Sequence, residues 1–265
     1  MSEAYPDRTS KVPYYTFTEE NAEAQWAELA ENPLLQRMNA CRDALVSDRY
    51  RPTYHYVNPE HRLNDPNGLC YWQGKWHLFY QAYPPEDSRQ HWGHAVSDDL
   101  VRWTDLPYAI YPDPEECCYS GACYVEDDRV IAMYHGTKVG AMVATSSDPL
   151  LLNWTKVKDD PVIPLVETDE KGFPYAVFDN CIWKEGEYYY ALSGGVVDGQ
   201  HGEKTGRAVE HIFRSRDLVS WVHLGEFVEG NIFGLPGDDG ACPYFWPIGN
   251  KHILLTYSHT RSAQY

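Results

Sequence analysis

The chain has 265 residues, of which 43% are hydrophobic, and it contains 21 tyrosines and 9 tryptophans. This composition is sufficient for a packed core and excludes a disordered chain. The formal net charge of -17, without any cluster of Lys or Arg, argues against nucleic acid and anionic membranes as partners. A neutral small molecule or oligosaccharide, such as a sugar, is compatible with this charge.

The N-terminal segment has no basic stretch followed by an apolar one, so we expect no secretory signal and a cytoplasmic protein. No apolar run approaches the roughly 18 residues of a membrane span. The seven cysteines form no CxxC pair and are interpreted as reduced thiols. The histidines are scattered, so we expect no catalytic metal and no cofactor. The oligomeric state is left open.

Residues 1–50 are predicted to form an N-terminal helical extension. Thr18 is the expected N-cap of a first helix, because acidic residues follow it in the first turn. Pro33 is expected to open a second helix that runs to about Ser47. We expect this extension to pack on a domain formed by residues 51–265.

Four later segments share one pattern, in which two runs rich in aromatic and β-branched residues flank a short polar turn. This pattern predicts β-hairpins. The four segments are Gly68–Gln81, Gly121–Gly136, Asn180–Gly195 and Cys242–His259.

A second element follows three of these hairpins and is a close copy each time. It reads Ser-x-Asp-Leu-x-x-Trp or a near variant and precedes another strand-like stretch, and it occurs at 97–103, 147–154 and 215–221. Its expected role is structural, closing turns between strands. Units of four strands that recur every 40–60 residues are typical of propeller blades. The similarity of the copies favours an all-β propeller over an ordinary β-sandwich. Because no fourth copy follows the last hairpin, the chain is expected to end inside a blade.

The residues that could take part in chemistry lie just ahead of the four hairpins. These positions are Asp65, Ser120, Asp179 and Ala241, and the innermost strands of a propeller bring such positions to one end of a central channel. Two carboxylates held close together cost free energy unless they are used. Glycoside cleavage uses two carboxyl groups, one to attack or to activate water and one to protonate the leaving oxygen.

Asp65 suits the first of these roles because of the pentapeptide Asn64–Gly68, which reads Asn-Asp-Pro-Asn-Gly. Pro66 is expected to fix a turn, and Asn67-Gly68 allows a tight backbone that presents the carboxylate. A plain β-turn is the alternative interpretation of the same five residues. Trp92 is the aromatic residue that we expect to form a wall of a sugar pocket, since a flat ring packs on sugar C–H faces.

Several segments resemble motifs of glycoside hydrolase family 32, the group of invertases, levanases and inulinases, and they occur in the same order as in that family. The similarity covers roughly residues 51–265, and its motifs are 61–69, 77–81, 91–97, 99–103 and 119–121. The resemblance implies a five-bladed propeller followed by a β-sandwich. About four blades would be present here, the last one incomplete, and the sandwich would be absent.

The same resemblance implies roles for individual residues. Asp65 would be the attacking carboxylate of a retaining mechanism, and Gln81 would touch the fructosyl ring. Asn64, Trp92 and Ser120 would line the substrate site, and Asp179 would stabilise the transition state.

Two positions depart from the family pattern. The family has Arg-Asp-Pro where this chain has Phe178-Asp179-Asn180, so the arginine is replaced while the carboxylate remains. The family has Glu-Cys-Pro where this chain has Ala241-Cys242-Pro243, so the glutamate that acts as acid and base is replaced. Loss of general acid catalysis typically costs 10²–10⁴-fold in rate.

Three explanations of Ala241 stay open. The alanine is engineered, or another acid such as Asp238, Asp239 or Glu229 replaces the glutamate, or the protein binds without cleaving. The divergence of the surrounding residues favours a natural variant. The function expected is therefore hydrolysis of β-fructofuranosides, and the alternative is a non-catalytic carbohydrate-binding propeller. A propeller glycosidase with another sugar specificity, of the arabinosidase type, is a third hypothesis.

Overall fold

The computed structural model describes residues 6–52, 54–165, 178–197, 206–229, 238–258 and 263–264. The chain divides into two compact units, and each is described by itself. Unit 1 comprises Met1–Tyr119, Val125–Ile131 and Ala144–Thr155, and unit 2 comprises Ser120–Tyr124, Ala132–Val143 and Lys156–Tyr265.

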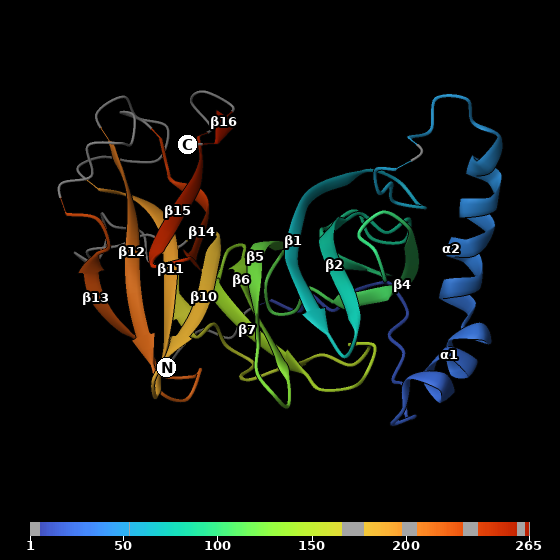
Figure 1. Ribbon diagram of the computed structural model, residues 1–265, viewed down its shortest axis with the longest axis horizontal. Helices are drawn as coiled ribbons and strands as arrows, with labels where there is room; N and C mark the ends of the chain where they lie inside the picture. Colours follow the sequence, from blue (N-terminus) through green and yellow to red (C-terminus); the bar gives the residue numbers. More distant parts are fainter. Residues whose placement is uncertain are drawn as a thin grey trace. The chain divides into compact units, whose positions relative to one another are not determined.

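Most of the regular secondary structure in the described residues is β-strand, and within each sheet the strands follow one another in sequence order (Figure 1). The sheet orders are β1-β2-β3-β4, β5-β6-β7-β8 with β9 paired to β7, β10-β11-β12-β13, and β14-β15-β16. Sheets of four strands in this order are consistent with propeller blades, as expected for an all-β chain. The strands are β1 Leu63–Trp72, β2 Lys75–Ala82, β3 His91–Ser97, β4 Trp103–Ile110, β5 Cys118–Val125, β6 Val130–Gly136, β7 Gly140–Ser146, β8 Thr155–Lys156, β9 Ile163–Pro164, β10 Asn180–Glu185, β11 Tyr188–Val197, β12 Arg207–Ser215, β13 Val222–Glu226, β14 Ala241–Ile248, β15 Lys251–Ser258 and β16 Ala263–Gln264.

All four predicted hairpins are present, as β1-β2, β5-β6, β10-β11 and β14-β15. The first hairpin, β1-β2, differs from the prediction in where its first strand begins. β1 starts at Leu63, so the pentapeptide 64–68 belongs to the strand and does not form a turn ahead of it. The expectation that Pro66 fixes a turn was therefore wrong. The reason is that residues 63–67 pair with β2 through register shifts, which absorb the irregular backbone within the ladder.

The repeated Ser-x-Asp-Leu motif closes turns, as predicted. After β3, the Ser97 hydroxyl accepts the Leu100 amide at 2.9 Å and the Asp99 carboxylate accepts the Arg102 amide at 2.7 Å. The same bonds recur after β12, where Ser215 accepts from residue 218 at 3.0 Å and Asp217 accepts from residue 220 at 2.7 Å. Side-chain acceptors at these spacings satisfy the turn amides locally, so the motif serves the fold.

The N-terminal extension contains α1 (Ala22–Ala30), α2 (Pro33–Ala44) and a 3₁₀ turn over Leu45–Ser47. The second helix begins at Pro33, as predicted. The first begins later than expected, because its N-cap is Asn21, whose side chain accepts the Ala24 amide at 2.9 Å. Thr18 was therefore the wrong cap: asparagine caps a helix at least as well as threonine, and Asn21 stands directly before the first helical residue.

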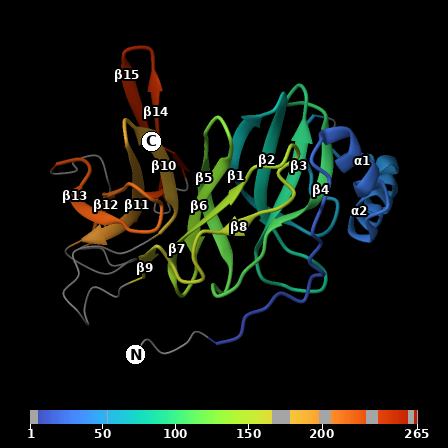
Figure 2. The same ribbon diagram turned by 90° about the horizontal axis from the view of Figure 1, so that it is seen from below.

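Both helices lie beside β4 in unit 1 (Figures 1 and 2). Leu29 and Leu35 pack with Val96 and Leu106 in a buried cluster, which joins the extension to the first sheet. Arg42 of α2 donates to both carboxylate oxygens of Asp105 in β4, at 2.9 and 2.6 Å. Among the described helices, none is both long and apolar enough to cross a membrane.

The Arg42–Asp105 pair gives a test of how the extension is held. Asp105 is 3% exposed and also accepts a hydrogen bond from the Tyr56 hydroxyl. Arg42→Ala therefore removes the cation but leaves the carboxylate buried. We expect the free energy of unfolding to fall by about 3 kcal/mol, because an ion pair broken on one side leaves an uncompensated buried charge. Urea unfolding followed by tryptophan fluorescence measures this.

The matched control is Arg102→Ala. Arg102 pairs with Asp99 at 2.9 Å, but its side chain is 87% exposed, so its loss should change stability by at most about 1 kcal/mol. Equal effects of the two substitutions would contradict the importance of the buried pair.

Candidate active site

Asp65 lies in a β-bulge of β1. Leu63 pairs with Ala82 and Pro66 pairs with Tyr80, so Asn64 and Asp65 together stand opposite the single residue at position 81. A bulge of this kind bends the strand and re-aims its side chains. The carboxylate of Asp65 is exposed, as a group that attacks a ligand must be.

Gln81 supports Asp65 from the neighbouring strand. This glutamine is 4% exposed, and its Nε2 lies 3.5 Å from Oδ2 of Asp65. Asn64 donates to the Tyr83 hydroxyl at 2.9 Å, and Gln90 donates to the same oxygen at 2.8 Å. The structure therefore brings Asn64, Asp65 and Gln81 together at one end of the β1-β2 hairpin.

Trp92 lies in β3 opposite Gln81, but its ring is fully buried. The ring stacks on Phe79 with centroids 5.7 Å apart, and its N–H donates to the Tyr119 carbonyl at 2.9 Å. This differs from the expected wall of a sugar pocket, because a ring with no exposed surface offers no face to a ligand. Trp92 instead packs against Phe79 of β2, the strand that carries Gln81.

Asp179 lies in unit 2, directly before β10. Its Oδ2 accepts the Cys242 amide at 3.1 Å and the Cys242 thiol at 3.2 Å. Oδ1 lies 3.7 Å from Nδ1 of His135, which comes from β6. Burial alone would raise the pKa of this carboxyl, but His135 and the two Cys242 donors lower it below the ordinary value of 3.8. Asp179 is therefore held as a carboxylate.

Ala241 begins β14 and is 2% exposed. Of the expected substitute acids, Asp238 accepts a short hydrogen bond from the Ser258 hydroxyl, and its other oxygen accepts the Asp239 amide at 3.2 Å. Asp239 is buried, at 4% exposure. Glu229 is exposed in the turn after β13. Residues 238–240 are buried and do not form a solvated loop.

Ser120 lies within β5 and is 1% exposed. It occupies the first strand of its sheet, as Asp65 does in β1. Asp65 lies in unit 1, whereas Ser120 and Asp179 lie in unit 2.

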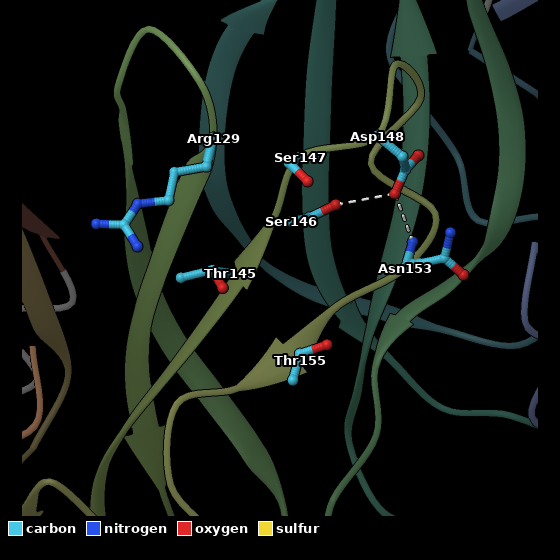
Figure 3. Close-up of a pocket in the computed structure, with 7 residues that line it drawn as sticks. All are labelled: Arg129, Thr145, Ser146, Ser147, Asp148, Asn153 and Thr155. Atoms are coloured by element: carbon cyan, nitrogen blue, oxygen red, sulfur yellow. Dashed lines mark hydrogen bonds between the residues drawn. The ribbon is translucent and has the colours of Figure 1, made fainter. Parts of the chain in front are cut away.

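A separate cavity of about 290 Å³ lies in unit 1 at the turn after β7 (Figure 3). Its carboxylate, Asp148, accepts the Ser146 hydroxyl at 3.0 Å and the Asn153 amide at 2.9 Å. Arg129 extends away from this turn and pairs with Glu126 at 2.8 Å. Asp148 serves the turn and Arg129 is paired elsewhere, so the cavity is not the candidate site. Within the described ranges, no group of three or more His, Cys, Asp or Glu side chains is arranged to hold a metal ion.

Two neighbours of Asp179 were missed by sequence reasoning. His135 was counted among the scattered histidines, and Cys242 was counted among the reduced thiols. The sequence held one signal for such a neighbour. Phe178 replaces the arginine that the family has next to this aspartate, so the carboxylate needs a hydrogen-bond donor from elsewhere in the chain. The residue that supplies it lies on a strand distant in sequence, so the sequence alone did not identify it.

Comparison with known proteins places these residues in a family. The sequence model of the glycosyl hydrolases family 32 N-terminal domain matches residues 55–264. A levanase of Bacillus subtilis is 32% identical over 220 residues, which are 77% of this chain and 30% of the levanase. A sucrose-6-phosphate hydrolase of Salmonella typhimurium is 30% identical, over 84% of this chain and 48% of that enzyme.

Solved structures agree. A family 32 β-fructofuranosidase of Bombyx mori has a TM-score of 0.64 and 33% identity, with 87% of this chain and 48% of that chain covered. An aspartate-to-alanine mutant of that enzyme in complex with sucrose has a TM-score of 0.63 and 31% identity, with 85% and 48% covered. The chain thus spans half or less of the length of these relatives. The family match covers most of the chain, and the chain therefore belongs to glycosyl hydrolases family 32.

Proposed function

We propose that the protein hydrolyses β-fructofuranosides of the sucrose or fructan type by a retaining mechanism, with Asp65 as nucleophile. The observation that carries this proposal is the exposed Asp65 carboxylate in the bulge of β1, with the Gln81 amide 3.5 Å away. The relatives described above are named as a levanase, a sucrose-6-phosphate hydrolase and a β-fructofuranosidase with a sucrose complex, and the proposal extends these substrate classes to this chain.

In the proposed reaction, the Asp65 carboxylate attacks the anomeric carbon of the fructosyl unit while the bond to the leaving oxygen breaks. Water then attacks the same carbon, releases fructose and regenerates the carboxylate. Asn64, Gln81 and Ser120 are proposed to bind sugar hydroxyls. Trp92 is proposed to act as buried support, since its ring is not exposed.

Asp179 is proposed to accept hydrogen bonds from the sugar and to stabilise the positive charge that develops on the ring. This role requires an ionised carboxyl group. The lowered pKa of Asp179, caused by His135 and Cys242 against the opposing effect of burial, supports it. His135 thereby compensates in part for the arginine that Phe178 replaces.

The finer architecture is also a proposal. We infer one propeller domain over residues 51–265, part of a five-bladed ring, with 1–50 as its helical extension and the family's β-sandwich outside this chain. This inference is supported by the equivalent places of Asp65, Ser120 and Asp179. Each of them lies within or directly before the first strand of a sheet. A cytoplasmic location remains a prediction from the sequence.

A binding protein without catalysis is the second candidate function. The observation that favours it is Ala241, which occupies the position where the family has its acid and base. Such a protein would retain the sugar contacts of Gln81 and Asn64 without turnover.

Asp65→Asn tests the nucleophile. The amide keeps the size of the side chain but cannot attack carbon, so we expect kcat/KM for sucrose or an aryl β-fructofuranoside to fall on the order of 10⁴-fold or more. The measurement is steady-state kinetics on the full-length protein, with fold checked by circular dichroism.

Asp98→Asn is the matched control, because Asp98 makes a surface pair with Lys75 in the same unit and should leave kcat/KM unchanged. If Asp65→Asn keeps wild-type turnover, the assigned nucleophile is incorrect. If the wild type turns over no fructoside but binds sucrose in calorimetry, the binding function replaces the enzymatic one.

His135→Ala tests the electrostatic setting of Asp179. Because His135 lowers the pKa of Asp179, its removal should raise that pKa and move the acid limb of kcat to higher pH. The folded-state pKa lies below the ordinary 3.8, so the stability linked to Asp179 is complete above that value and is lost as pH falls through the folded pKa. The variant should accordingly lose stability in acid at a higher pH than the wild type.

Carbon-13 NMR titration of the aspartate carboxyl groups measures the pKa directly. The control is His252→Ala, since His252 is exposed and stacks on Phe245. An unchanged Asp179 titration in His135→Ala would refute the assigned influence of the imidazole.

A further inference from the structure

The cavity of about 290 Å³ at the turn after β7 has no part in the reaction described above. Every residue that lines it is polar, and all of them belong to unit 1 (Figure 3). Three hydroxyl groups line it, from Thr145 in β7, Ser147 in the turn and Thr155 in β8. Ligand pockets usually have roughly 300–1,000 Å³, so this volume suits one small molecule.

This turn differs from the two other copies of the repeated motif. Ser146 donates to Asp148 as the serines after β3 and β12 donate to their aspartates, but two more residues precede the tryptophan. In the other copies the residue between serine and aspartate is charged and paired, since Asp98 binds a lysine at 2.7 Å and Arg216 a glutamate at 3.0 Å. The corresponding residue here is Ser147. A neutral hydroxyl group therefore stands in this turn where the others carry a paired charge.

The walls of the cavity are fixed by hydrogen bonds around Asp148. Its carboxylate accepts from the Ser146 hydroxyl and the Gln25 side chain, both at 3.0 Å, and from two amides of the turn, both at 2.9 Å. Gln25 lies fully buried in α1 and also accepts the Leu150 amide at 3.0 Å. The carboxylate is thus satisfied, and the helical extension holds the turn in place. A site that is already ordered loses little conformational freedom on binding.

The hydroxyl groups of the lining are available to a ligand. Within the described part of the chain, the side chains of Thr145, Ser147 and Thr155 take part in no hydrogen bond. Ser147 and Thr155 are exposed, so a ligand can reach them. Each hydroxyl group can donate one hydrogen bond and accept two.

We propose that this cavity binds a neutral polyhydroxylated molecule of the size of one monosaccharide, at a site separate from Asp65. Sugar hydroxyls both donate and accept, as the hydroxyls of the lining do, so the two sets are complementary. The described lining contains no aromatic ring, so the ligand is held by its hydroxyl groups and not by stacking.

An anion fits this cavity less well than a neutral sugar. It offers acceptors only, and it would lie near the carboxylate of Asp148. The positive charge of Arg129, which also lines the cavity, is already paired with Glu126 at 2.8 Å. The proposed site does not depend on the catalytic function proposed above.

The test is a titration of the full-length protein with D-fructose and with D-glucose, followed by carbon-13 NMR of the threonine methyl groups. We expect the signals of Thr145 and Thr155 to shift and to saturate. The dissociation constant should be on the order of 1 mM, because a few neutral hydrogen bonds hold the ligand. Thr104, which is exposed in β4 of the same unit, is the control whose signal should not shift.

Variants then connect the binding to the hydroxyl groups. Ser147→Ala and Thr155→Val each remove one hydroxyl, and each should raise the dissociation constant about 3–10-fold, measured on the Thr145 signal. Thr104→Val is the matched control and should leave it unchanged. Asp65→Asn should also keep the shifts, because Asp65 does not line the cavity.

The inference is overturned if neither sugar shifts the two signals, if the shifts grow without saturation, or if Ser147→Ala and Thr155→Val bind as tightly as the control. It is equally overturned if inorganic phosphate shifts the signals and the sugars do not, or if Asp65→Asn abolishes the shifts. None of these measurements requires turnover. A protein that hydrolyses no fructoside but shows the saturable shifts would contradict the proposed function and still support this site.

Discussion

The close passage of Gly240 over Gly194 is the constraint on which the arrangement in unit 2 depends. The carbonyl of one glycine occupies the space of the other's missing side chain, so the chain entering β14 lies directly on the sheet. In the same segment, the Cys242 amide and thiol donate to Asp179. It also covers Glu210 and removes that carboxyl group from water. One backbone contact therefore sets the surroundings of two acids, and a side chain at either glycine would separate them from β14.

The two acids respond in opposite directions because their surroundings differ. Asp179 receives donors from His135 and Cys242, and these overcome the burial that would otherwise raise its pKa. Glu210 experiences burial with little compensation, so its pKa rises to about 7. Environments that move the pKa values of two carboxyl groups apart are typical of sites in which one group stays charged and the other transfers a proton. The ionised form is therefore favoured for Asp179 and disfavoured for Glu210.

Local patterns in the sequence predicted much of this structure. The hairpins, the Ser-x-Asp-Leu turns and the helix at Pro33 depend on residues a few positions apart, and the structure contains all of them. The bulge at Asp65 was missed because register depends on the partner strand β2. The burial of Trp92 and the bonds of Asp179 depend on strands far apart in sequence. Glu210 had no local signal, since a glutamate in a strand is ordinarily a solvated residue.

The place of Glu210 in its sheet explains why burial affects its carboxyl group so strongly. β12 is paired on both sides, with β11 and β13, and the chain before β14 lies against the carboxyl oxygen. Burial removes this group from water, and this favours its neutral form. Asp179 stands directly before the first strand of the same sheet and receives donors from β6 and β14, which favour its ionised form. The place of each acid in one sheet therefore moves the two pKa values in opposite directions.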